Sequence, residues 1–133
     1  MGNTKEDSVQ SALYISRLSG GYNIHSVHNS THGLYTDTKE CYHNLFNNNA
    51  TSPSRLLHEM WDEHLDEDDE NTILHVAHSQ GCIHTRNSLE TYHEEKRLRI
   101  FVVAIAPGGY IDTESCAKVA HYRAYSHRDL VPR

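Results

Sequence analysis

Ser79 lies at the centre of the segment Ala77-His-Ser-Gln-Gly81, whose residue types and spacing could support nucleophilic chemistry. Small side chains two positions before and after a serine allow a tight strand-to-helix turn, because larger ones would clash with the neighbouring strand and helix. Such a turn strains the backbone of the serine and projects its hydroxyl away from the sheet. The helix that follows carries partial positive charge at its start, and the backbone N–H of Gln80 would be one donor to a developing oxyanion.

The segments around Ser79 have the character that such a turn needs. Residues 71–79 form a β-branched run that is typical of a buried strand, and residues 80–98 contain no proline and favour a helix. Residues 100–106, Ile-Phe-Val-Val-Ala-Ile-Ala, are the most apolar segment of the chain and predict a second buried strand. Ser79 is therefore expected between a central strand and a helix.

The remaining elements are predicted from periodicity and from helix start and stop signals. An apolar face predicts a helix over residues 7–19 that stops at two glycines, and weak alternation predicts a strand over residues 22–28. A further helix is expected to begin at Ser52-Pro53 and to end at the acidic run 66–70, with an apolar stripe formed by Leu56, Leu57, Met60, Trp61, His64 and Leu65. A last short strand is predicted over residues 121–126.

The order of these elements predicts the fold class. Helices and strands alternate along the chain, which is the pattern of parallel sheets with right-handed crossover helices. We therefore expect an α/β protein with three αβα layers and a mostly parallel sheet of about four strands. The length of 133 residues predicts a single domain over residues 1–133.

The chain resembles the α/β-hydrolase superfamily around Ser79, because Ile-Leu-His-Val-Ala-His-Ser-Gln-Gly is similar to a central strand that runs into a nucleophile elbow. The resemblance is closest to a chlamydial branch of hydrolase-like proteins of unknown function. The segments Ser-Gly-Gly-Tyr-Asn-Ile-His and Val-Val-Ala-Ile-Ala-Pro-Gly-Gly-Tyr-Ile carry this narrower likeness. The resemblance implies a serine hydrolase that acts on an ester, thioester or amide, with Ser79 as nucleophile and Ala77 and Gly81 as the small elbow residues.

The resemblance also implies a catalytic acid. Ala-Tyr-Ser-His-Arg-Asp-Leu-Val-Pro, residues 124–132, is similar to the end of the hydrolase strand that carries the acid, which makes Asp129 the candidate. The family's histidine base would then follow Arg133, and its second oxyanion loop would precede Gly2. We therefore expect the chain to be a fragment of a longer hydrolase, without appreciable turnover alone. Leu130-Val-Pro-Arg133 also matches the remnant of a thrombin-cleaved tag.

Two alternatives stand beside this assignment. Asp112 and His127 could supply the acid and the base within the chain, because the order Ser79, Asp112, His127 also agrees with the order of triad residues in this fold. A non-catalytic α/β binding or scaffolding module could instead retain the elbow as a packing device. A small-molecule or acyl substrate fits the enzyme, and its identity does not follow from the sequence.

Charge and histidine content narrow the other partners. The formal net charge is −6, so the chain lacks the basic surface that nucleic-acid binding requires. No apolar run is long enough to span a membrane. Twelve histidines invite a metal assignment, but His75 and His78 alternate on a strand, and His25, His28 and His32 lack matching carboxylates or thiolates. We expect neither a metal site nor a cofactor.

Cysteine usage and the expected sheet bear on compartment and assembly. Cys41, Cys82 and Cys116 are an odd number at wide spacing, which favours reduced thiols and a reducing compartment such as the cytoplasm. Secretion by a route without a cleaved signal is an alternative. A truncated sheet would leave both edges open, so we expect a homodimer through exposed sheet edges.

Overall fold

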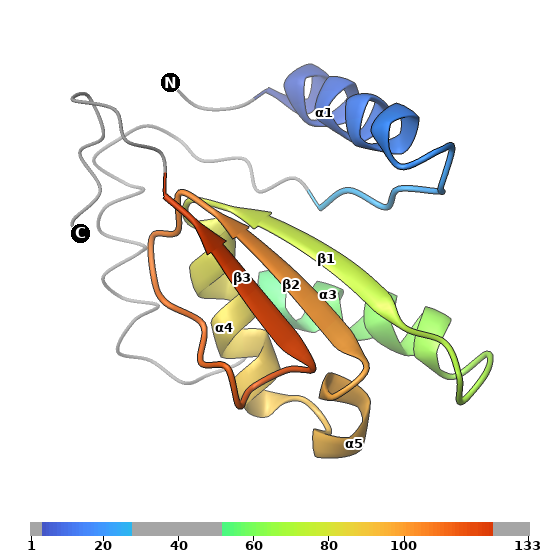
Figure 1. Cartoon of the computed structure of the whole chain (residues 1–133), viewed down its shortest axis with the longest axis vertical. Helices are drawn as coiled ribbons and strands as arrows, with labels where there is room; N and C mark the ends of the chain where they lie inside the picture. Colours follow the sequence, from blue (N-terminus) through green and yellow to red (C-terminus); the bar gives the residue numbers. More distant parts are fainter. Residues whose placement is uncertain (1–3, 28–51, 124–133) are drawn as a thin grey trace. The chain divides into compact units, whose positions relative to one another are not determined.

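The computed structural model describes residues 4–27 and 52–123, and the chain divides into two compact units, Met1–Glu40 and Cys41–Arg133. The first unit contains helix α1 (Lys5–Leu18), and all the other described elements belong to the second unit (Figure 1). No helix in the described ranges is long and apolar enough to cross a membrane.

Helix α1 begins two residues before the predicted start because Thr4 and Asp7 form a capping box. The Thr4 hydroxyl accepts the Asp7 N–H at 3.2 Å, and the Asp7 carboxylate accepts the Thr4 N–H at 2.8 Å. The predicted strand over residues 22–28 is wrong for residues 22–27, which form no strand; residue 28 lies outside the described residues. The Ser16 hydroxyl donates to the Tyr22 carbonyl at 2.7 Å, and the Ser8 and Ser26 hydroxyls lie 2.6 Å apart. Contacts with the helix thus replace the strand ladder that the weak alternation suggested.

The second unit is built on a parallel sheet of three strands in the order β1-β2-β3 (Figure 1). Its elements follow the chain as α3 (Ser52–Leu65), β1 (Ile73–His78), α4 (Gly81–Thr91), α5 (Glu94–Arg97), β2 (Ile100–Ile105) and β3 (Lys118–Tyr122). The α/β class with a parallel sheet is thereby confirmed. The expectation of about four strands is wrong for the described residues, because the segment after α1 does not form a strand.

Two element boundaries differ from the sequence prediction. The predicted helix over residues 80–98 is interrupted at Tyr92, whose extended backbone (φ −90°, ψ 160°) separates α4 from α5. Strand β3 begins at Lys118 rather than at residue 121, since the Ala117 N–H already donates to the Ile100 carbonyl at 2.9 Å. Residues 124–126 of that predicted strand lie outside the described residues.

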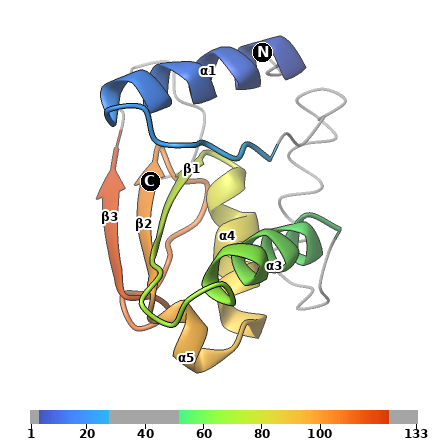
Figure 2. The same cartoon turned by 90° about the vertical axis from the view of Figure 1, so that its right-hand side faces the viewer.

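One face of the sheet carries the core of the second unit. Ile100, Val102 and Ala104 of β2 are at most 2% exposed, and α3 and α4 lie together on one side of the sheet (Figure 2). Helix α3 contributes Leu57, Trp61 and Leu65 at spacings of four residues. Leu56 and His64 are exposed, so the buried stripe is narrower than the sequence suggested.

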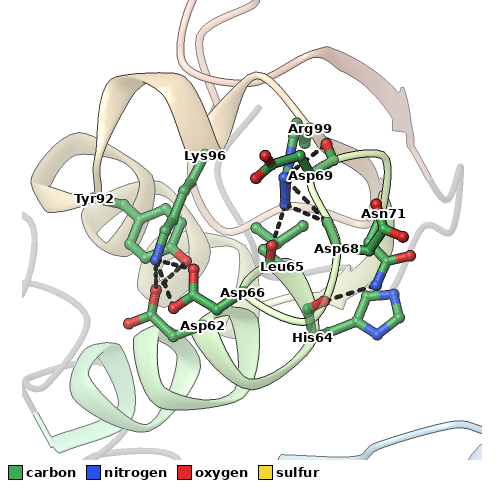
Figure 3. A network of polar contacts seen from close by, with 10 residues as sticks. All are labelled: Asp62, His64, Leu65, Asp66, Asp68, Asp69, Asn71, Tyr92, Lys96 and Arg99. Carbon is green, nitrogen blue, oxygen red and sulfur yellow. Dashed lines mark hydrogen bonds and ion pairs between the residues drawn. The ribbon is translucent and has the colours of Figure 1, made fainter.

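Polar contacts tie the end of α3 to α5 and to the start of β2 (Figure 3). Lys96 binds the carboxylates of Asp62 and Asp66, and the Tyr92 hydroxyl donates to Asp62 at 2.8 Å. Burial alone would raise the pKa of Asp62, but the hydrogen bonds from Lys96 and Tyr92 outweigh it and the pKa is lowered. Arg99 donates to the carbonyls of Leu65 and of the following turn, which satisfies the end of the helix.

Candidate functional site

Ser79 occupies the turn between β1 and α4 with a backbone that few serines adopt. Its φ is +51°, in the left-handed region, directly after the last residue of β1. The Ser79 N–H donates to the Ile105 carbonyl at 3.1 Å, and the Ser79 carbonyl accepts the N–H groups of Cys82 at 3.1 Å and Gly108 at 3.0 Å. The strained conformation is therefore held from β2, from α4 and from the loop after β2.

The first turn of α4 leaves two neighbouring donors free. Within residues 52–123, the backbone N–H groups of Gln80 and Gly81 make no hydrogen bond, whereas those of Cys82 and Ile83 donate to the carbonyls of Ser79 and Gln80. Free N–H groups at a helix start carry partial positive charge and donate hydrogen bonds to anionic oxygens. The two donors directly follow the strained serine in the chain.

Ser79 is partly buried, and its hydroxyl makes no hydrogen bond in the part of the chain that the structure describes. Asp112 is exposed and engaged in its own turn, where its carboxylate accepts the Glu114 N–H at 3.0 Å and its carbonyl accepts the Ser115 N–H at 3.1 Å. The structure therefore gives no contact between Asp112 and Ser79. Asp129 and His127 lie outside the described residues, as do residues 130–133.

The loop after β2 packs closely on the elbow, a feature that the sequence analysis missed. A Cβ at Gly108 would lie 3.1 Å from the Ser79 carbonyl oxygen, and a Cβ at Gly109 would lie 3.2 Å from Ile83. A Cβ at Gly81, by contrast, would meet nothing within 4 Å. The close approach that the elbow pattern placed at Gly81 is therefore found at Gly108, and Pro-Gly-Gly after the most apolar strand was the available signal.

A second group of side chains lies where β2 and β3 end. The His121 Nε2 accepts the backbone N–H of Ile111 at 3.3 Å, so a neutral His121 carries its proton on Nδ1. The Tyr110 ring lies 4.8 Å from the His121 ring, and the Arg123 guanidinium lies 5.3 Å from the Tyr110 centroid. Because its Nε2 is already occupied, His121 is not a free base at that atom.

Cys82 is a fully buried core residue close to the turn, and His75 is a half-buried residue of β1. The His75 Nε2 lies 2.9 Å from the Thr85 Oγ1, and burial lowers the pKa of the imidazole to about 4. Burial raises the pKa of the Cys82 thiol to about 11, so this fully buried side chain is protonated at neutral pH. The described residues contain no group of three or more His, Cys, Asp or Glu side chains that could hold a metal ion.

Comparison with known proteins identifies no relative of this chain. No known family, no curated protein and no solved structure matches the chain. The described residues therefore define a broad class, an α/β protein with a parallel sheet and a strained serine at a strand-to-helix turn.

Proposed function

We propose that this chain is a serine hydrolase-like domain in which Ser79 is the nucleophile toward an ester, thioester or amide. The main support is the left-handed backbone of Ser79, φ +51°, at the end of β1. A left-handed residue other than glycine costs about 1–2 kcal/mol, and such strain recurs at functional sites. Here the neighbouring carbonyls and N–H groups hold it in place.

The two free N–H groups suit the charge that the reaction develops. As the Ser79 Oγ forms its bond to the acyl carbon, the hydroxyl proton passes to the base, the carbonyl π electrons move to oxygen, and the Gln80 N–H stabilises that oxyanion. The free N–H of Gly81 follows that of Gln80 in the chain, at the positive end of α4. The tetrahedral intermediate then expels the leaving group, which takes that proton from the base. Water later gives a proton to the same base as it attacks the acyl-serine, and the proton returns to the Ser79 Oγ as the acid is released.

The remaining machinery comprises an acid and a base. Asp129 is the first candidate for the acid, with a histidine base outside these 133 residues, and Asp112 with His127 is the pair within the chain. A serine hydroxyl without a base is a weak nucleophile at neutral pH.

The experiment is labelling of the 133-residue chain with a fluorophosphonate probe, with and without added imidazole as an external base. Ser79→Ala removes the nucleophile. Ser88→Ala is the matched control, because Ser88 is a buried α4 serine whose hydroxyl donates to the His84 carbonyl at 2.7 Å, away from the turn. We expect labelling of the wild type and of Ser88→Ala, and none of Ser79→Ala.

The dependence on imidazole separates the two candidate bases. Labelling only with imidazole would mean that the base is outside the chain, whereas labelling without it would favour Asp112 and His127. If the wild type stays unlabelled in both conditions, the hydrolase proposal is overturned. The non-catalytic binding module would then be the better account.

We also propose that the chain self-associates through its sheet edges. Within residues 52–123, β1 and β3 each pair with β2 on one side only. An unpaired strand edge is a template for pairing with another chain. Sedimentation velocity over a range of concentrations should show a dimer, and a single monomer boundary at high concentration would contradict it.

A further inference from the structure

Thr85 lies at the junction between β1 and the first turn of α4, with its hydroxyl between two polar partners. Its Oγ1 lies 2.8 Å from the Gly81 carbonyl and 2.9 Å from the His75 Nε2. The residue is 1% exposed, so water does not compete for these contacts. This hydroxyl connects the middle of β1 to the residue that carries one of the two free donors.

The direction of each hydrogen bond follows from the single proton of the hydroxyl. The Gly81 carbonyl has no proton, so Thr85 donates to it and must accept the bond from His75. His75 therefore carries a proton on Nε2. The lowered pKa of this imidazole agrees with a neutral ring.

The surroundings of His75 keep the ring in this orientation. The His75 and Trp61 rings form a T-shaped pair with centroids 5.5 Å apart and planes at 85°, and Trp61 is itself 3% exposed. The Tyr92 ring also packs against Trp61, with the two ring centroids 5.1 Å apart. A ring fixed by aromatic packing offers its Nε2 proton to one acceptor, the Thr85 hydroxyl.

Gly81 needs such a restraint more than other residues of α4. It lacks a Cβ, and a Cβ built there would meet no atom within 4 Å, so side-chain packing does not limit its backbone. The bond from Thr85 to its carbonyl therefore limits how the first turn can move. The orientation of the free N–H groups of Gln80 and Gly81 depends on that turn.

We infer that Thr85, supported by His75, is a positioning residue that fixes the first turn of α4 and thereby aims the Gln80 and Gly81 N–H groups beside Ser79. The inference rests on the proposed function for its catalytic consequence, because these N–H groups are the proposed oxyanion donors. The His75-to-Thr85-to-Gly81 chain itself is a structural claim that can be tested without activity.

The test compares Thr85→Val, which removes the hydroxyl but keeps the shape, with Thr85→Ser, which restores it. Thr91→Val is the matched control, because Thr91 makes the same kind of bond to the Asn87 carbonyl, at 3.0 Å, at the far end of α4. The rate of Ser79 phosphonylation with imidazole should fall about tenfold or more in Thr85→Val, since small misplacements are expensive in catalysis. Thr85→Ser and Thr91→Val should stay within about threefold of the wild type.

A second readout does not depend on chemistry at Ser79. Nitrogen NMR of the wild type should show His75 as the Nε2–H tautomer. Amide exchange at Cys82 and Ile83, whose N–H groups donate to the Ser79 and Gln80 carbonyls in the first turn of α4, should accelerate in Thr85→Val but not in Thr91→Val. The Nδ1–H tautomer, or unchanged exchange in Thr85→Val, would overturn the positioning role. If Thr85→Val does not fold, His75→Phe, which keeps a ring on Trp61 without the donor, should accelerate the same two amides. An unlabelled wild type with the expected NMR results would defeat only the hydrolase proposal.

Discussion

At the scale of single residues, the conformation of Ser79 makes a prediction about stability. Glycine adopts a φ of +51° without steric cost, whereas alanine pays for its Cβ. Ser79→Gly should therefore be more stable than Ser79→Ala by about 1 kcal/mol. Urea unfolding of both variants measures the difference.

The same pair of substitutions in the interior of α4 provides the control for Ser79. At Ser88, which has ordinary helical surroundings, Ser88→Gly should be less stable than Ser88→Ala by about 1 kcal/mol. The order of stability should thus reverse between the two positions. The same order at both would show that Ser79 does not hold a left-handed backbone in solution.

Gly108 provides a second residue-scale prediction. A Cβ there would meet the Ser79 carbonyl oxygen at 3.1 Å, and this backbone atom cannot rotate away. Gly108→Ala should destabilise the chain by about 1–3 kcal/mol and slow phosphonylation of Ser79. Gly81→Ala, which meets no atom within 4 Å, should leave the free energy of unfolding close to that of the wild type.

At the scale of elements, Arg99 terminates α3 by donating to the carbonyls of Leu65, Asp68 and Asp69. Arg99→Met should lower the free energy of unfolding by about 1–2 kcal/mol, because these carbonyls lose a charged donor. Arg55→Met is the control on the same helix, since among the described residues Arg55 makes only an exposed pair with Glu59 at 3.7 Å. Equal losses in urea unfolding would contradict the capping role of Arg99.

Local signals predicted the elements that they specify, and long-range contacts decided the rest. Ser52-Pro53 and the acidic run after Leu65 marked the ends of α3, and the apolar run 100–106 marked β2. The strand predicted from the alternation after α1 is wrong, because Tyr22 and Ser26 make hydrogen bonds to residues of α1 instead. The helix breaks at Tyr92, whose hydroxyl donates to Asp62 thirty residues earlier in the chain, and no local pattern encodes this contact.

The candidate site shows the same division. The small-x-Ser-x-small pattern located Ser79 at the turn that the structure contains, because this signal is local. Gly108 lies 29 residues further along the chain, so its contact with the Ser79 carbonyl could not be read from the pattern. Thr85 resembled any helix threonine until the position of the His75 ring was known.

At the scale of the whole molecule, His75 predicts how stability depends on pH. Its pKa falls from 6.5 to about 4 on folding, so the unfolded chain binds more protons between these values. Stability should therefore decrease as pH falls from 6.5 to 4, by up to about 3 kcal/mol from this group. The lowered pKa of Asp62 adds a loss only below about 3.8, in the same direction.

Variants isolate the histidine contribution from the other titrating groups. His75→Phe should flatten the dependence of the unfolding free energy between pH 6.5 and 4. His93→Gln replaces an exposed histidine and should retain the wild-type slope. A wild-type slope in His75→Phe would show that the imidazole is not held neutral by the fold.

The central claim is that the hydroxyl of Ser79 is the nucleophile, and mapping a phosphonyl adduct tests it most directly. Trypsin should release residues 56–86 as one peptide in which Ser79 is the only serine. After fluorophosphonate treatment with imidazole, fragment ions should place the added mass on Ser79 in the wild type, and Ser79→Ala should show no modified 56–86 peptide. An unmodified 56–86 peptide in the wild type, or an adduct on a different peptide alone, would contradict the account.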